Sequence, residues 1–157
     1  MAAYFVVMDD IDRKITNLLA ADARRALADI GAAVGLSASA VNDRIRRLQA
    51  QGAIRAFTVD ADPAALGLPV LAFVWVSLRD GADEAAFRSF AAAHPAVMEC
   101  HHVTGPWSYL VKLRLPALAA IETVLAEIKA QGFLGRSKTI LALSSPVEGA
   151  HVPKGAA

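Results

Sequence analysis

The chain has 157 residues and an almost balanced charge, with 16 basic and 15 acidic side chains and a net charge of +1. This length allows one domain or two small ones, and the balance excludes a histone-like basic protein and an acidic tail protein. Apolar residues make up 55% of the chain, which is far too many for a disordered protein.

The first 55 residues predict three helices. In the first, two acidic residues open a stretch with apolar residues at helical spacing, at Ile11, Ile15, Leu18 and Leu19. The second is short and stops at Gly35, a residue type that favours the left-handed conformation of a helix end. The third is capped by Ser37 or Ser39 and ends at Gly52.

From residue 54 the pattern changes to mixed strands and helices. The predicted strands are residues 54–59, 70–78, 97–104, 107–115 and 137–144, and the predicted helices are 83–93 and 116–132. The order from residue 70 onward is β-α-β-β-α-β, which is the ferredoxin-like split unit. The predicted fold is therefore α+β, with a helix-turn-helix domain at 1–56, a strand and linker at 57–69, a ferredoxin-like domain at 70–148 and a tail at 149–157.

Cysteine usage indicates a protein of a reducing compartment, and hydropathy argues against a membrane span. The single cysteine, Cys100, excludes an internal disulfide framework and a four-cysteine zinc site. The first eight residues have neither a basic leader nor a small-residue cleavage site, so we do not expect a signal peptide. The longest uncharged stretch, residues 63–78, is interrupted by prolines and is shorter than the about 20 residues of a spanning helix. We therefore expect a cytoplasmic protein with no membrane partner.

The third helix carries the strongest functional signal. When its apolar residues Val41, Ile45 and Leu48 face the core, the opposite side is polar and basic. A basic second helix after a short glycine-containing turn is typical of a helix-turn-helix, in which small residues approach base edges and arginines reach phosphates or guanine. The predicted DNA contacts are Ser37, Ser39, Asn42, Asp43, Arg44, Arg46 and Arg47. The alternative is an ordinary amphipathic helix with a solvated arginine side.

The strand at 71–78 is apolar on both faces, with Leu71, Phe73 and Trp75 on one and small or branched residues on the other. A four-stranded sheet with two helices on one face normally has a wet outer face. This outer face needs a cover, and a second copy of the chain is the simplest one. We therefore predict a dimer formed by the second domain; cover by the first domain is the alternative.

The sequence Cys100-His101-His102 suggests a metal site at first sight. Alternation along a strand sends Cys100 and His102 to one face and His101 to the other, which disfavours three converging ligands. Ser108 lacks the context of a catalytic nucleophile, and glycine patterns for phosphate binding are absent from the sequence. We predict no metal, no cofactor and no catalytic residue. The turn at 103–110 is either a plain hairpin or one wall of a ligand pocket.

Taken together, these motifs closely resemble the leucine-responsive/asparagine regulator (Lrp/AsnC) family of prokaryotic transcription factors. The matching pieces are D-x-x-D-x-x-I-x-x-L-L near the start, the V-G-L-S turn, R-I-R-R-L-x-x-x-G-x-I and the D-P-x-x-L-G linker. The segment ECHHVTGPWSYLVKLRLP resembles the ligand-sensing domain of that family, called the RAM domain. The resemblance covers residues 8 to about 148, in the right order.

The resemblance implies a winged or extended helix-turn-helix, a ferredoxin-like sensing domain and homodimers that commonly assemble into octamers. It also implies an amino acid or related metabolite bound between sensing domains. The usual family turn G-D-x-D-Y is here Gly105-Pro106-Trp107-Ser108-Tyr109, and the loss of both acidic residues disfavours a plain α-amino acid. The effector contacts that the resemblance implies are His102, Thr104, Gly105, Trp107, Ser108, Leu118, Leu141 and Ala142.

The function predicted from the sequence is that of a sequence-specific, nucleoid-associated transcription regulator that binds double-stranded promoter DNA and is modulated by a small molecule. A ligand-independent architectural DNA-binding protein is one alternative. The other is an enzyme similar to the siroheme decarboxylases, whose sensing-type domain uses histidines, here His101 and His102. An enzyme has no need of several arginines on one side of a helix, which favours the regulator.

Overall fold

The structure of the protein, a computed structural model, describes residues 8–147 and consists of two compact units. One unit covers the described residues up to 60, and the other runs from 61 to 147. The boundary falls inside the predicted linker. The predicted tail at 149–157 and the first seven residues lie outside the described part.

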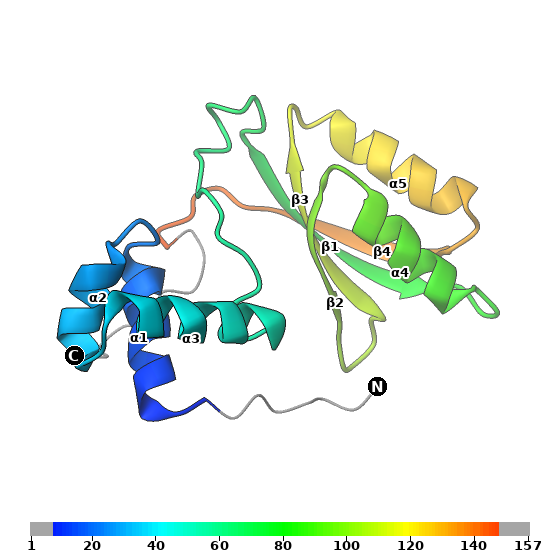
Figure 1. Cartoon of the computed structure of the whole chain (residues 1–157). Coiled ribbons are helices and arrows are strands. Elements are labelled where there is room, and N and C mark those ends of the chain that lie inside the picture. The colour runs from blue at the N-terminus through cyan, green and yellow to red at the C-terminus, as the bar shows by residue number, and fades with distance from the viewer. Residues whose placement is uncertain (1–7, 148–157) are drawn as a thin grey trace. The chain divides into compact units, whose positions relative to one another are not determined.

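The first unit contains three helices, α1 (Asp10–Ala21), α2 (Leu27–Val34) and α3 (Ala38–Ala50), which form a small bundle (Figure 1). The Asp9 carboxylate caps α1 by accepting the Asp12 N–H at 2.7 Å, and the Ser37 hydroxyl caps α3 by accepting the Ala40 N–H at 3.2 Å. Gly35 ends α2 in the left-handed conformation, as predicted. The bundle core consists of Ile15, Leu19, Ile30, Val41 and Ile45.

The prediction of a strand at residues 54–59 is wrong. These residues belong to no helix or strand, and none of the described strands pairs with them. An extended segment without a partner leaves its backbone N–H and C=O groups to water, so alternation in the sequence is not enough to make it a strand. Phe57 and Val59 are exposed there.

The second unit has the predicted β-α-β-β-α-β order. Its elements are β1 (Val70–Leu78), α4 (Glu84–Ala93), β2 (Val97–His102), β3 (Tyr109–Leu115), α5 (Ala120–Ala130) and β4 (Leu134–Leu141). The strands form one antiparallel sheet in the order β2-β3-β1-β4. The bounds of β1 are those predicted, whereas β4 begins three residues earlier than expected.

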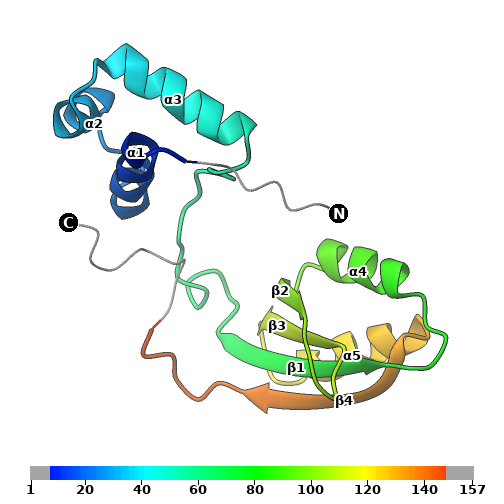
Figure 2. The same ribbon diagram turned by 90° about the horizontal axis from the view of Figure 1, so that it is seen from below.

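Both helices of this unit pack on the same face of the sheet (Figure 2). Phe87 of α4 and Ile128 of α5 join a core made from alternate residues of the two central strands, such as Val74 and Val111. The predicted second apolar face also exists. We call it the open face; its central residues are Phe73, Trp75, Leu110 and Ile140, which alternation places opposite the helices.

Candidate DNA-binding and ligand-binding sites

The first candidate site is the side of α3 that faces away from the bundle core. Ser39, Asp43 and Arg46 are exposed there, and Asn42 is half-buried. At the start of the helix the hydroxyls of Ser37 and Ser39 lie 3.0 Å apart and share a hydrogen bond. The helix therefore presents small polar groups at its N-terminal end and a cation about two turns later, an arrangement suited to base edges and phosphates.

The structure separates the three arginines that the sequence placed together. Arg44 Nη1 lies 2.8 Å from Asp12 Oδ1, and Arg47 Nη2 lies 2.7 Å from Asp12 Oδ2. Arg44 Nη1 also contacts Asp9 Oδ2 at 2.7 Å. Within residues 8–147, Arg46 makes no such ion pair.

These contacts tie α3 to the start of α1. The side chain of Asp12 is only 4% exposed, so the two guanidinium groups take the place of water as its hydrogen-bond partners. The hydrogen bond from Arg44, followed by the backbone N–H of Asp12, lowers the pKa of Asp9. The same hydrogen bond to Asp9 raises the pKa of Arg44. A helical pattern identifies which residues share a side, but it does not reveal that an acidic residue of another helix reaches them.

The second candidate site is the turn between β2 and β3, where Ser108 has a structural role. Its hydroxyl accepts the N–H of Leu78 at 3.1 Å, at the register shift between β1 and β4. Its own N–H donates to Val76 O at 2.9 Å, and its carbonyl accepts the Val103 N–H at 3.1 Å. The hydroxyl is therefore already used to hold the turn against the end of β1.

An aromatic and basic cluster lies beside this turn. The guanidinium of Arg136 lies 4.6 Å from the ring centroid of Trp107 and donates to Pro106 O at 2.7 Å. The rings of Trp75 and Trp107 are 6.4 Å apart. The cluster offers a cation and a flat aromatic surface next to the turn that the sequence singled out.

The residues implied as effector contacts fall at two opposite ends of the sheet. Ser108 bonds to the end of β1 at Leu78, whereas Leu141 pairs with Ala72 and Ala142 donates its N–H to Leu71 O. Ala72 and Leu78 are six residues apart along β1, which is about 20 Å at the rise of a strand. The turn end holds His102, Thr104, Gly105, Trp107 and Ser108, and the far end holds Leu118, Leu141 and Ala142. One copy of the chain does not bring these eight residues into a single pocket.

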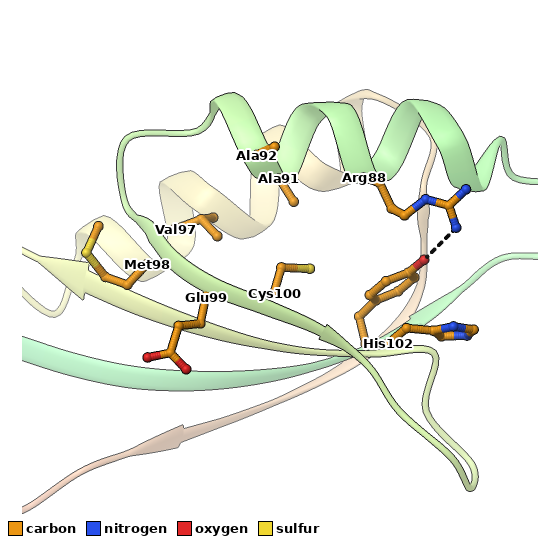
Figure 3. Close-up of a pocket in the computed structure, with 9 residues that line it drawn as sticks. Arg88, Ala91, Ala92, Val97, Met98, Glu99, Cys100 and His102 are labelled. Carbon is orange, nitrogen blue, oxygen red and sulfur yellow. Dashed lines mark hydrogen bonds between the residues drawn. The ribbon is translucent and has the colours of Figure 1, made fainter. Parts of the chain in front are cut away.

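A groove of about 450 Å³ lies between α4 and the edge strand β2 (Figure 3). It is lined by Arg88, Ala91, Ala92, Val97, Met98, Glu99, Cys100, His102 and Tyr109. Only His102 belongs to the effector residues predicted from the sequence. The β2 register pairs Cys100 and His102 with buried residues of β3 and His101 with Leu110, so the predicted alternation of these three residues is confirmed.

The polar end of the groove is a hydrogen-bonded group that the sequence analysis missed. The Tyr109 hydroxyl donates to Glu84 at 2.6 Å, and Arg88 Nη1 lies 3.2 Å from Glu84. The hydrogen bond from Tyr109 lowers the pKa of Glu84, and burial followed by that bond raises the pKa of Tyr109. The rings of His102 and Tyr109 stack at 5.1 Å. The only available sequence signal was the spacing of Glu84 and Arg88, four residues apart on one helix.

The middle of the groove is apolar and holds a thiol. Figure 3 shows Cys100 below Ala91, while Glu99 points away from α4. Burial raises the pKa of the Cys100 thiol, which favours its neutral form at pH 7. No three His, Cys, Asp or Glu side chains among residues 8–147 could hold a metal ion. Over the same residues, no helix is long and apolar enough to cross a membrane.

Comparisons with known proteins match both units of the chain. A family model described as the AsnC-type helix-turn-helix domain matches residues 8–49, and one described as the Lrp/AsnC ligand binding domain matches residues 71–152. The HTH-type transcriptional regulator FL11 of Pyrococcus horikoshii is 32% identical over 148 residues, which cover 94% of this chain and 97% of that protein. The leucine-responsive regulatory protein of Escherichia coli is 37% identical over 123 residues, covering 76% of this chain and 74% of that protein.

Solved structures show the same relationship. The crystal structure of the leucine response regulatory protein LrpA of Mycobacterium tuberculosis matches with a TM-score of 0.83 and 30% identity, covering 93% of this chain and 100% of that chain. An AsnC family transcriptional regulator from Agrobacterium tumefaciens matches with a TM-score of 0.83 and 26% identity, covering 93% and 97%. These relatives are transcriptional regulators and not enzymes. The chain therefore belongs to the Lrp/AsnC family of DNA-binding transcriptional regulators that carry a ligand-binding domain.

Proposed function

We propose that this regulator reads a specific operator through the outer side of α3, with Arg46 on phosphate or guanine and Ser39 and Asn42 at base edges. The observation that supports this most directly is the exposed position of Ser39 and Arg46 on the second helix of a helix-turn-helix. Binding of this kind has a sequence-independent electrostatic part and a base-specific part, and different side chains carry the two.

The experiment is a comparison of two kinds of variant on DNA selected from a random duplex pool. Arg46→Ala should weaken binding to all sequences and lower the slope of log affinity against log salt by about 0.9, because one phosphate contact releases its counterion. Ser39→Ala and Asn42→Ala should change sequence preference, at about 1 to 3 kcal/mol for each lost base contact. Lys129→Ala is the matched control, because it removes one exposed cation from α5 in the other unit. An Arg46 variant with the same affinity and slope as the Lys129 variant would refute the assignment.

We infer that the effector is a small metabolite with a negative charge or an aromatic ring, bound between sensing units of different copies. Two observations support this. The eight residues implied by the resemblance are divided between opposite ends of one sheet, so two copies are needed to bring the ends together. The turn end offers Arg136 and Trp107 beside Trp75 of the open face and His102 on the α4 side, whereas Ser108 offers no carboxylate to an ammonium group.

A thermal-shift screen tests this inference, since a ligand that binds only the folded protein raises its melting temperature. Small carboxylates and aromatic acids should stabilise the protein more than plain α-amino acids do. His102→Leu should reduce the shift caused by the best ligand, and Ser108→Asp should increase affinity for an amino acid. Tight binding of a simple amino acid by the unmodified protein, unaffected by either change, would contradict the inference.

We also propose that the protein acts on the nucleoid in the cytoplasm as a homodimer joined through the open face, with octamers built from such dimers. Two copies related by a two-fold axis would present two α3 helices to half-sites about one turn of DNA apart. The support for this proposal is the apolar centre of the open face, formed by Phe73, Trp75, Leu110 and Ile140.

A further inference from the structure

We propose that Asp12 holds α3 in its DNA-reading position through Arg44 and Arg47, and that these two arginines position the helix instead of binding DNA. We call these three side chains the Asp12 clamp. The inference rests on the proposed role of α3 in DNA binding. It divides the arginines of α3 into two that position the helix, Arg44 and Arg47, and one that contacts DNA, Arg46.

The geometry of the clamp is that of a shared, buried carboxylate. Each oxygen of Asp12 receives one guanidinium, Oδ1 from Arg44 at 2.8 Å and Oδ2 from Arg47 at 2.7 Å. The two arginines are three residues apart on α3, so they lie on one side of the helix and one turn apart. The clamp therefore restrains α3 at two points against α1, which limits both its rotation and its tilt.

The burial of Asp12 explains why these guanidinium groups are committed. Asp12 is 3% exposed overall, whereas the side chains of Arg44 and Arg47 are 24% and 48% exposed. An arginine that moved to a DNA phosphate would leave one oxygen of the buried Asp12 carboxylate without its charged hydrogen bond, and a buried acceptor that loses such a bond is costly. Arg44 would also lose its contact with Asp9. A phosphate must therefore compete with bonds that the folded unit already needs.

The charges within the clamp and at Asp9 cancel, since two carboxylates face two guanidinium groups. Their long-range attraction for DNA is correspondingly small. On α3 this leaves Arg46 as the cation available to DNA, because it is exposed and has no ion pair within residues 8–147. Counterion release should therefore depend on Arg46 and not on its two neighbours.

The decisive experiment is Asp12→Asn in the full chain, with Asp10→Asn as the matched control. Both changes remove one carboxylate from the same turn of α1, but Asp10 is exposed and, among residues 8–147, pairs with Arg13 alone. Electrostatics alone predicts tighter DNA binding for both variants, because each removes a negative charge near DNA. The clamp predicts the opposite for Asp12→Asn, a loss of about tenfold in affinity, because the bonds that position α3 are lost. Asp10→Asn should bind as well as the unmodified protein or better.

A second pair of variants covers the case in which Asp12→Asn is partly unfolded at the binding temperature, as judged by circular dichroism. Arg44→Gln and Arg47→Gln should each weaken binding with an unchanged salt slope, whereas Arg46→Ala lowers the slope by about 0.9. In a double-mutant cycle the losses from Asp12→Asn and Arg44→Gln should be less than additive, because both remove the same bond.

Two results would contradict the proposed role of the Asp12 clamp. One is Asp12→Asn binding as tightly as Asp10→Asn. The other is a salt slope that falls in Arg44→Gln and Arg47→Gln as much as in Arg46→Ala, which would make all three arginines phosphate contacts. If none of the α3 variants, Arg46→Ala included, changes DNA binding, the assignment of α3 itself fails, and this outcome is distinct from a failure of the clamp alone.

Discussion

The hydroxyl of Ser108 accepts the Leu78 N–H where the pairing of β1 with β4 shifts register. A register shift interrupts the backbone ladder, so a donor at that point needs a partner from a side chain. This explains how the turn between β2 and β3, which lacks the acidic residues of the usual family turn, still holds its position. The position that the resemblance assigns to the effector thus also supports the fold.

Ser108→Ala should therefore destabilise the protein. The change leaves the half-buried Leu78 N–H without its acceptor, at a cost of about 1 kcal/mol in the free energy of unfolding. Ser108→Asp should recover most of this loss, because a carboxylate oxygen also accepts the bond. Urea denaturation of both variants measures the difference, and Ser144→Ala in the exposed segment after β4 is the control. Equal stability of the Ser108→Ala and Ser144→Ala variants would show that the bond contributes nothing.

A second residue-scale prediction concerns pH and Glu99 on the edge strand. Glu99 accepts a hydrogen bond from Lys112 at 2.7 Å and lies 3.0 Å from His101, and these bonds, Lys112 first, lower its pKa. A carboxyl whose pKa is lower in the folded than in the unfolded protein adds stability above its unfolded value, near 4.3, and loses it as the pH falls through the folded value.

Glu99→Gln should accordingly be less stable than the unmodified protein at pH 7, by about 0.2 to 1 kcal/mol as is typical of exposed pairs. The difference should shrink as the pH falls below about 4.3 and vanish once the carboxyl is protonated in both states. Denaturant titrations at several pH values measure it. Asp60→Asn, which removes an exposed carboxylate outside any helix or strand, should leave stability unchanged at pH 7. A difference that is constant from neutral to acid pH would contradict the assignment.

Among the elements, those with strong local signals were predicted best. β1 is a continuous apolar run between a proline-containing turn and a charged one, and its predicted bounds are confirmed. β4 was placed three residues too late because Gly135 and Arg136, which precede the predicted start, are not typical strand residues. Pairing with β1 decides the actual start, since Leu134 lies opposite Leu78. Polar residues are tolerated there because β4 is an edge strand with one side exposed.

At the level of the helix-turn-helix, Gly31 permits the close approach of α2 and the turn that follows it. A Cβ at this position would overlap the carbonyl oxygen of Leu36, and the Leu36 N–H donates to Gly31 O at 2.9 Å. Gly31 sits inside a helix with a regular backbone, so the constraint is the space available and not its own conformation.

The change in stability caused by Gly31→Ala separates packing from helix propensity, because the two effects predict changes of opposite sign. Propensity alone would stabilise the variant by about 1 kcal/mol. The overlap with the Leu36 backbone should instead destabilise it by about 1 to 3 kcal/mol, the usual cost of overpacking. Ala32→Gly, on the next residue of α2, is exposed and should lose only the propensity difference of about 1 kcal/mol. Thermal denaturation compares the two, and a Gly31→Ala variant more stable than the unmodified protein would refute the packing argument.

For the whole molecule, the sequence predicted the two domains and their order but not the grouping of side chains within each site. The helical pattern put Arg44, Arg46 and Arg47 on one side of α3, and a buried partner in another helix then divided them. The effector residues implied by resemblance were treated as one set, and the sheet separates them by the length of β1. In both cases the deciding contact joins residues far apart in sequence, which local periodicity does not report.

The last prediction concerns assembly through the open face. Its apolar centre, formed by Phe73, Trp75, Leu110 and Ile140, is surrounded by charged residues of the neighbouring strands such as Lys138. Apolar patches on a sheet rimmed by charge are typical of interaction surfaces, and two sheets packed face to face bury such a patch around a two-fold axis. Because Phe73 lies opposite the core face, Phe73→Glu should leave each copy folded but place a charge at the centre of the interface.

Light scattering should therefore show a monomer for Phe73→Glu at a micromolar concentration at which the unmodified chain is at least dimeric. Leu66→Glu is the matched control, because it adds the same charge at an exposed apolar residue in the turn before β1 and should leave assembly unchanged. A fragment from Leu68 onward should still dimerise, since the open face lies wholly within it. A folded Phe73→Glu variant that remains dimeric, or a soluble fragment that is monomeric, would show that the copies meet elsewhere, and the pairing of two α3 helices on one face of DNA would then need a different interface.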